Sequence, residues 1–334
     1  MDVNAQKWVL LGTGGTIAGT AAVAGDNLGY SAAQLSVQAL WQGASSLPEG
    51  GAPWLLEQVA QVDSKDMDFA VWAALAQRCQ QHLADPTVGG IVITHGTDTL
   101  EETAWFLYCV LAAQLQHKPV VLTCAMRPAS ALAPDGPQNL RDAAAVAMAP
   151  GACGVLVVCA GEIHGARQVY KAHPYRLAAF SSGDAGPLGW VEEGQVRLAQ
   201  NWPLAHTEQA LLAIKNRVKM LYRTPWPQVE IVMSYAGASA TVVDALVRSG
   251  VQGLVVAATG NATLHYALQA ALERAQASGV AVRVASRCPL GQTLARPGAA
   301  LPGAQGLSPV KARVSLLLEL LAAQTQQRPD QRGV

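Results

Sequence analysis

The stretch Leu10-Leu11-Gly12-Thr13-Gly14-Gly15-Thr16-Ile17 runs from an apolar segment into a glycine-rich turn. The apolar segment, residues 7–13, has the pattern of a buried strand. The turn then lies at the carboxyl edge of a sheet, which is where open α/β folds bind their ligands. We therefore expect an α/β fold with a ligand site that begins at this turn.

The rest of the chain alternates short apolar runs with longer helical stretches, a pattern typical of βαβ units and of a parallel sheet covered on both faces. Strands are expected at residues 7–13, 90–94, 119–123, 154–160, 229–234, 253–259 and 280–286. Helices are expected between them, with Asp66 capping residues 67–84 and a further helix over 99–115. Ser308-Pro309 opens the last helix, 310–324, because proline suits the first helical position.

The 334 residues are enough for two domains. The βα rhythm breaks between about residues 181 and 228, with one hairpin expected at 189–198, and a second series starts at Val229. We expect a larger N-terminal doubly wound, flavodoxin-like domain over residues 1–210 and a linker over 211–228. A smaller C-terminal α/β domain is expected over 229–334.

The composition excludes several classes of protein. Apolar residues make up 51% of the chain, and 23 basic residues balance 23 acidic ones, which gives no field to hold a nucleic acid or an anionic membrane. No apolar run approaches the roughly 20 residues that a membrane-spanning helix needs. The first residues show no signal peptide, and six cysteines without CxxC spacing are typical of reduced thiols. We expect a cytoplasmic protein, or a periplasmic one if a signal peptide has been removed.

A glycine-rich turn after the first strand raises the question of dinucleotide binding. In the pattern G-x-G-x-x-G/A started at Gly12, the last position falls on Ile17, and another loop follows where the motif requires a helix. The alternative use of the turn is to present a side chain, and Thr16 is that side chain. A threonine hydroxyl acts as a nucleophile only if a base removes its proton. The alternative is a purely structural role for Thr16 as a helix cap or turn residue.

The next expected strand ends in His95-Gly96-Thr97-Asp98-Thr99, at the same edge of the sheet. A hydroxyl and a carboxylate stand side by side there, ahead of a helix whose N-terminus favours negative charge. A capping box of Thr99 with Glu102 explains Thr99 but makes no use of Thr97. His95 is interpreted as a structural histidine in a turn.

Two further residues fit a site at this edge. Lys171 follows the strand expected at 154–160, and a desolvated lysine is the best candidate for a base that serves Thr97. Ser64 stands just ahead of a helix, where its hydroxyl could hold a carboxylate. Alternatively, Lys171 is a solvated surface residue and Ser64 an N-cap.

Taken together, these stretches resemble the bacterial-type L-asparaginases and glutaminase-asparaginases. The two signatures of that family, TGGTI and HGTDT, stand here as Thr13-Gly14-Gly15-Thr16-Ile17 and His95-Gly96-Thr97-Asp98-Thr99. Shorter matches keep the family's order from residue 8 to about 320. They are Ser64-Lys65-Asp66-Met67, Ala125-Met126-Arg127-Pro128, Asp135-Gly136-Pro137-Gln138-Asn139-Leu140, Pro187-Leu188-Gly189, Tyr235-Ala236 and Lys311-Ala312-Arg313.

The resemblance implies hydrolysis of a side-chain amide, L-asparagine to L-aspartate and ammonia, through a threonine acyl-enzyme, with glutaminase side activity open. It implies Thr16 as the nucleophile, Tyr30 as the loop residue that helps to activate it, and Thr97, Asp98 and Lys171 as a second triad. Ser64 would bind the substrate carboxylate and Asp98 its ammonium, with the Gly15 and Thr97 N–H groups as oxyanion donors. Neither a metal nor an organic cofactor is implied.

The resemblance also implies a homotetramer, a dimer of dimers whose sites are completed across a subunit interface. This chain departs from the pattern there, because Thr263 replaces the family's asparagine and residues 289–307 contain no Asp or Glu. The substrate partner is then a small amino-acid amide. Two other functions stay open: an α/β protein whose glycine turn holds a phosphate, and an amidotransferase subunit, whose extra N-terminal domain is not expected here because the TGGT turn begins at residue 13.

Overall fold

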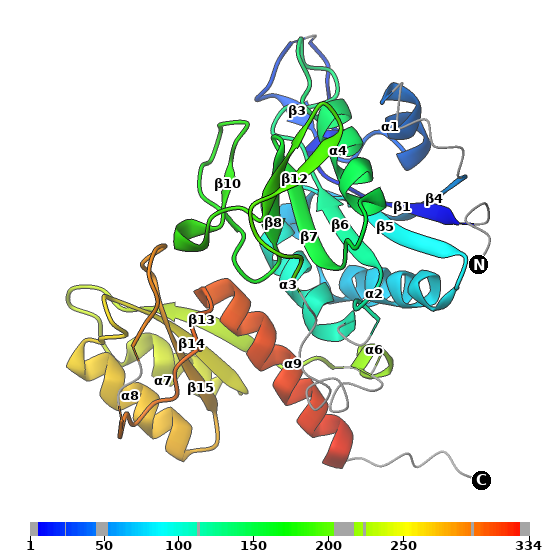
Figure 1. Cartoon of the computed structure of the whole chain (residues 1–334). Coiled ribbons are helices and arrows are strands. Elements are labelled where there is room, and N and C mark those ends of the chain that lie inside the picture. Colours follow the sequence, from blue (N-terminus) through cyan, green and yellow to red (C-terminus); the bar gives the residue numbers. More distant parts are fainter. Residues whose placement is uncertain are drawn as a thin grey trace. The chain divides into compact units, whose positions relative to one another are not determined.

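The computed structural model describes residues 6–23, 25–44, 53–111, 114–203, 217–222, 225–294 and 297–327, and the chain divides into two compact units, Met1–Val218 and Lys219–Val334. Figure 1 shows both units as α/β layers. Much of the linker expected at 211–228 lies outside the described residues. Each unit is taken by itself below.

Unit 1 is built on an eight-stranded sheet in the order β12-β11-β8-β7-β6-β5-β1-β4. Its parallel strands are β4 (Trp54–Val62), β1 (Lys7–Gly14), β5 (Val88–Thr94), β6 (Pro119–Thr123) and β7 (Gly154–Cys159). In chain order this is 2-1-3-4-5, the flavodoxin-like doubly wound arrangement. The expected fold class is therefore confirmed for the larger unit.

Three antiparallel strands complete the other edge of this sheet. They are β8 (Glu162–Gly165), β11 (Gly189–Glu192) and β12 (Gln195–Leu198), and the last two form the expected hairpin. Two small two-stranded ribbons lie outside the large sheet. They pair β2 (Thr20–Ala21) with β3 (Tyr30–Ser31) and β9 (Tyr170–Lys171) with β10 (Phe180–Ser181).

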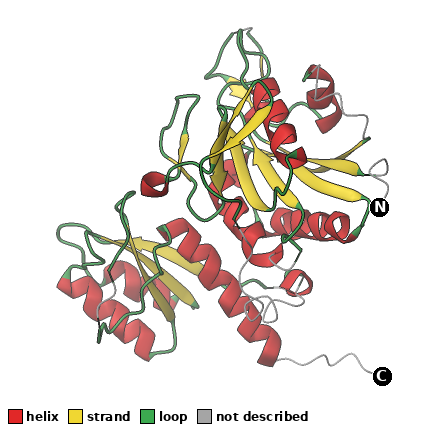
Figure 2. Ribbon diagram, in the orientation of Figure 1, coloured by secondary structure: helices red, strands yellow, loops and turns green. Residues whose placement is uncertain are grey.

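Helices cover both faces of the sheet (Figure 2). Alternate residues of β5, β6 and β7 form one core with α4 (Gly136–Met148) and α1 (Val37–Gly43), while α2 (Phe69–Ala84) and α3 (Leu100–Leu111) pack together against β5 and β7. Consecutive residues of these strands are fully buried, as expected when a sheet is covered on both sides. Three short helical turns complete this unit: η2 (Thr16–Ala18), η3 (Ser64–Asp66) and η4 (Gly183–Ala185). Helix α6 (Arg217–Met220) spans the boundary between the two units in the sequence.

The sequence prediction did not include the short strands β2, β3, β8, β9 and β10, and three further details of it were wrong. Strand β4 was missed, because its residues are mostly half-buried and show no continuous apolar run. Helix α2 is capped by Asp68, whose carboxylate accepts from the Val71 N–H at 2.8 Å, and not by Asp66, which lies in η3. Helix α3 ends at Leu111, followed by residues 112–113 outside the described part, and does not extend to 115.

Unit 2 is a smaller α/β layer. Its three parallel strands are β13 (Val229–Met233), β14 (Gly253–Ala258) and β15 (Ala281–Ser286), with β14 in the centre. Helices α7 (Thr241–Arg248), α8 (Tyr266–Ala277) and α9 (Pro309–Gln327) pack on this sheet, and the last starts at the predicted proline. In the described part of the chain, no helix is long and apolar enough to cross a membrane.

Candidate active site

The glycine turn after β1 brings two strand ends into contact. Gly14 and Gly15 have φ angles of +101° and +82°, which L side chains rarely adopt. A Cβ on Gly15 would overlap the main chain of Gly96, in the loop after β5. The neighbouring residues Thr16 and Thr97 therefore come from two backbone segments that touch at the carboxyl edge of the sheet.

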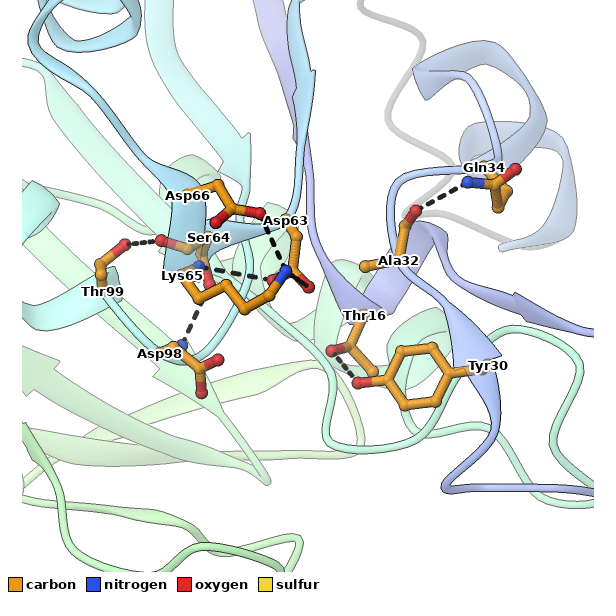
Figure 3. Close-up of polar contacts among 10 residues, drawn as sticks. All are labelled: Thr16, Tyr30, Ala32, Gln34, Asp63, Ser64, Lys65, Asp66, Asp98 and Thr99. Atoms are coloured by element: carbon orange, nitrogen blue, oxygen red, sulfur yellow. Dashed lines mark hydrogen bonds and ion pairs between the residues drawn. The ribbon is translucent and has the colours of Figure 1, made fainter.

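Thr16 is held in the first half of the site. It begins the short turn η2, is 9% exposed, and its Oγ1 lies 2.7 Å from the hydroxyl of Tyr30 (Figure 3). Tyr30 comes from β3, and its ring passes so close to Gly19 that a side chain there would collide with it. The phenol is thus placed to exchange a proton with Thr16.

Thr97, Asp98 and Lys171 form the second half of the site. Lys171 Nζ donates to Thr97 Oγ1 at 2.8 Å and to Asp98 Oδ1 at 2.6 Å. The Lys171 side chain is 19% exposed and that of Asp98 50%. Because Lys171 occupies a lone pair of the Thr97 oxygen, the hydroxyl hydrogen of Thr97 is directed elsewhere. Lys171 arrives on β9, after β8 has reversed the chain direction.

Ser64 links the loop after β4 to the second half of the site. Its Oγ accepts from the Asp98 N–H at 3.1 Å, and its carbonyl accepts from Thr99 Oγ1 at 2.8 Å (Figure 3). Ser64 is 2% exposed, whereas Lys65 is exposed and pairs with Asp63 and Asp66, whose carboxylates raise the pKa of the lysine. The bond to Asp98 uses the Ser64 oxygen as acceptor, so its hydroxyl hydrogen can still serve a carboxylate.

The expected oxyanion donor at Gly15 is not available. Its N–H donates to Val62 O, at the end of β4, with an N···O distance of 2.9 Å. A donor engaged in this way fixes the turn against β4 and offers no free hydrogen bond to a substrate. The expectation for the Thr97 N–H stays a prediction.

His95 is structural, as the sequence indicated. It is completely buried, its Nδ1 lies 2.7 Å from the Gly96 carbonyl, and burial lowers its pKa to about 4. A neutral imidazole whose Nδ1–H donates to that carbonyl supports the loop between Gly96 and Thr97. Its Nε2 has no hydrogen-bond partner among the described residues, so His95 makes no hydrogen bond to Thr97.

The turn after β1 does not have the geometry of a dinucleotide site. That motif needs a helix directly after the turn, so that its N-terminus can face a pyrophosphate. Here the three-residue turn η2 and the short strand β2 follow instead. Among the described residues, no group of three or more His, Cys, Asp and Glu side chains could hold a metal ion.

In unit 2, Thr263 closes a turn at the carboxyl end of β14. Its Oγ1 donates to Thr259 O at 3.0 Å and lies 2.9 Å from Thr259 Oγ1. Asn261, in the same turn, accepts from the Leu294 N–H at 2.7 Å. Thr263 therefore stabilises its own loop.

The fold and the site together define the class to which this protein belongs, that of two-domain α/β enzymes. Two hydroxyl side chains lie at the carboxyl edge of the larger sheet, one beside a phenol and one beside a lysine–carboxylate pair. The family models narrow this class. The N-terminal asparaginase model matches residues 7–204, and the model of the glutaminase/asparaginase C-terminal domain matches residues 228–332. This chain belongs to the asparaginase family.

Individual relatives agree with this assignment. The chain is 35% identical to L-asparaginase 2 of Escherichia coli, over 96% of this chain and 91% of the relative. It is 36% identical to a glutaminase-asparaginase of Pseudomonas fluorescens, over 95% and 86%. Among solved structures, a probable cytoplasmic L-asparaginase from Campylobacter jejuni superposes with a TM-score of 0.85 at 35% identity, covering 96% of this chain and 98% of that one.

Sequence reasoning gave no role to one set of polar residues near Tyr30. Ser130 accepts a hydrogen bond from β2, and Asp135 and Asn139 hold the loop on which Ser130 lies. The stretch Asp135-Gly136-Pro137-Gln138-Asn139 was a signal of this support, because a polar motif just inside a helix start points to local hydrogen bonds.

Proposed function

We propose that the chain is an L-asparaginase that converts L-asparagine to L-aspartate and ammonia through an acyl-enzyme on Thr16. The observation that carries the proposal is the pair of hydroxyl groups on touching loops, each with its own proton partner within 2.8 Å. Membership of the asparaginase family and the likeness to L-asparaginase 2 of Escherichia coli support amide hydrolysis.

In the first step, Thr16 Oγ1 attacks the amide carbon of the substrate while its proton passes to the Tyr30 oxygen, and the phenol gives up its own proton to solvent, so that Tyr30 stays neutral. The C–N bond then breaks, and the nitrogen leaves as ammonia after gaining a proton. Thr97 is the donor placed for this transfer, because Lys171 can replace the proton that Thr97 gives up. Water then attacks the ester carbon and gives a proton through Thr97 back to Lys171, while the departing Thr16 oxygen takes a proton from Tyr30, which regains one from solvent. Aspartate is released and the Thr16 hydroxyl is restored.

The remaining groups fit an α-amino acid. Asp98 presents Oδ2 to the substrate ammonium while Oδ1 holds Lys171, and the Ser64 hydroxyl hydrogen is directed to the substrate carboxylate. One fixed carboxylate and one hydroxyl suffice for a small zwitterion, which needs no net protein charge. Closure of the β2–β3 ribbon over Thr16 would exclude water and strengthen these interactions.

The principal test is ammonia release from L-asparagine by the wild type and by Thr16→Ala. We expect the alanine variant to lose at least about a thousandfold in kcat, since no other group replaces the nucleophile. Thr87→Ala is the matched control, because Thr87 hydrogen-bonds Asp85 at an exposed loop. A Thr16→Ala enzyme with wild-type kcat would contradict the assignment of the nucleophile.

Glutaminase side activity is proposed from the likeness to the glutaminase-asparaginase of Pseudomonas fluorescens. A comparison of L-asparagine, L-glutamine and D-asparagine under the same conditions tests both reaction and pocket size. Turnover of L-glutamine at less than about a thousandth of the L-asparagine rate would rule it out as a significant activity.

We also propose a homotetramer, a dimer of dimers with sites completed between subunits, in the cytoplasm. The six free cysteines favour a reducing compartment, while relatives include both a probable cytoplasmic and a probable periplasmic L-asparaginase. Light scattering on the purified protein and fractionation of the source cell test these two statements. A monomer with full activity would contradict the first, and recovery from the periplasm the second.

A further inference from the structure

Tyr30 lies on an element that has little structure of its own. Strands β2 and β3 contain two residues each and pair only Thr20 with Ser31 and Ala21 with Tyr30. An isolated two-stranded hairpin is marginally stable at best in water. We call β2, β3 and the described residues between them the Tyr30 hairpin. Its 2.7 Å contact with Thr16 therefore needs support from elsewhere in unit 1.

The loop between β6 and α4 has the opposite character. Asp135 accepts from the N–H groups of Met126 and Arg127 at 3.0 and 2.9 Å, and the Arg127 guanidinium donates to Ala133 O at 3.1 Å. Buried Asn139 donates to both Asp135 Oδ2 and Cys124 O, at 3.2 and 2.9 Å. This loop, residues 126–135 and called the platform below, is thus closed on itself and fixed to the sheet.

The platform holds the Tyr30 hairpin along one side. The Ala21 N–H donates to Ser130 Oγ at 2.8 Å, and the Gly25 N–H donates to Ser130 O at 3.4 Å. The Ala129 N–H donates to Gly19 O at 2.9 Å, and the Leu132 side chain lies over Gly25, where a Cβ would come within 3.3 Å of it. Ser130 is the side chain that joins the two elements at their centre.

We propose that Ser130 is a positioning residue for the reaction: its hydroxyl holds Ala21, the residue paired with Tyr30, and so keeps the Tyr30 phenol on Thr16. The inference rests on the proposed function, because Tyr30 matters only if Thr16 is the nucleophile. Ser130 itself acts through the hairpin. The platform supplies a fixed support, and the Ser130 hydroxyl is the side-chain hydrogen bond of this support to the strand paired with Tyr30, so its loss lowers the fraction of the protein that has Tyr30 in place.

The first measurement is hydrogen exchange of the peptide 19–31, which does not depend on activity. Loss of one hydrogen bond in Ser130→Ala is expected to raise its exchange rate about fivefold, with the β5 peptide unchanged. Ser130→Thr keeps the hydroxyl and should restore protection. Ser249→Ala, which removes one hydrogen bond to Leu246 O in unit 2, is the matched control. Leu132 is 91% exposed, so Leu132→Ala cannot unfold the core and should raise exchange about twofold.

The second measurement is steady-state kinetics with L-asparagine. We expect kcat of Ser130→Ala to fall about fivefold with KM changed less than twofold, because Ser64 and Asp98 are held by hydrogen bonds with each other, Thr99 and Lys171 and not by the hairpin residues described. Ser130→Thr should recover kcat. Unchanged exchange, or faster exchange with wild-type kcat, would overturn the proposal. A wild type that releases no ammonia would refute the proposed function, and the exchange result would still decide whether Ser130 holds the hairpin.

Discussion

The two halves of the site are held in different ways. Thr97 follows β5, a strand buried on both faces, and its Oγ1 accepts a hydrogen bond from Lys171. The next two residues of its loop are held by Ser64, which accepts from the Asp98 N–H and from Thr99 Oγ1. Thr16 also follows a buried strand, but its partner Tyr30 lies on a ribbon of two-residue strands. Thr97 is thus supported by the large sheet, whereas the partner of Thr16 lies on a small separate element; under the proposed function, that element is the half that admits the substrate. A loop fixed by the large sheet and a residue on a small separate ribbon thus lie at the same edge of the sheet.

The largest effect is expected in the fixed half. Lys171→Met removes the donor to Thr97 and leaves Asp98 without its cation, so kcat should fall by up to about 10⁴-fold, or about 5 kcal/mol of activation free energy. Lys118→Met is the control, since Lys118 donates to Leu83 O and Asp85 O away from the site. Retention of kcat within tenfold would mean that Thr97 needs no proton partner.

The main-chain contact between Gly15 and Gly96, which joins the two halves of the site, should be disrupted by any side chain at position 15. Gly15→Ala combines a φ of +82° with overlap on Gly96, and we expect it to lower the free energy of unfolding by about 4 kcal/mol. Gly194→Ala has a similar φ of +77° with open space around it, so it isolates the backbone term. Denaturant unfolding measures both. Equal losses in the two variants would show that Gly15 and Gly96 are not in tight contact.

The stability that buried His95 gives to the loop before Thr97 should depend on pH. Because the pKa of His95 is lowered to about 4 in the fold and is about 6.5 when unfolded, the unfolded chain binds more protons between these values. Stability is therefore lost as pH falls through this window, by about 3 kcal/mol at pH 4. We expect the free energy of unfolding of His95→Asn to decline less steeply with falling pH than that of the wild type. His117 is exposed, so His117→Asn should decline as steeply as the wild type. Parallel curves for all three proteins would exclude this contribution.

The smallest effect is expected in the adjustable half. Tyr30→Phe removes only the hydroxyl that contacts Thr16, and the loss of a hydrogen bond of this kind predicts about a tenfold lower kcat, or about 1.4 kcal/mol. KM should change little, since Ser64 and Asp98 are untouched. A loss as large as that of Lys171→Met would mean that the two halves do not differ in the way described.

Much of this architecture was predictable from the sequence. Continuous apolar runs marked β1, β5, β6 and β7, because a strand covered on both faces leaves no polar alternation to confuse the pattern. Strand β4 escaped because it is an edge strand with Glu57 in its middle, and that carboxylate pairs with Arg78 and His82 across the sheet surface. The partners of Glu57 lie on α2, so the sequence around β4 alone does not show that this carboxylate is paired.

The same distinction applies to the site. Hydroxyl groups directly after two buried strands, at Thr16 and Thr97, could be placed together because parallel strands end at one edge. The role of Ser130 could not be predicted, since it arises from one hydrogen bond to the Ala21 main chain, 109 residues away. The Gly15 N–H was assigned wrongly because its acceptor, Val62 O, belongs to the missed strand β4.

The contact of Gly15 with Gly96 has a consequence for redesign. Where two main chains touch, no side chain sets the spacing, so the offset between the loops of Thr16 and Thr97 is a property of the backbone. Substitutions of other side chains around Thr16 and Thr97 can therefore leave the two hydroxyl groups unshifted relative to each other. For directed evolution, this makes the pair a fixed point around which selectivity can be searched.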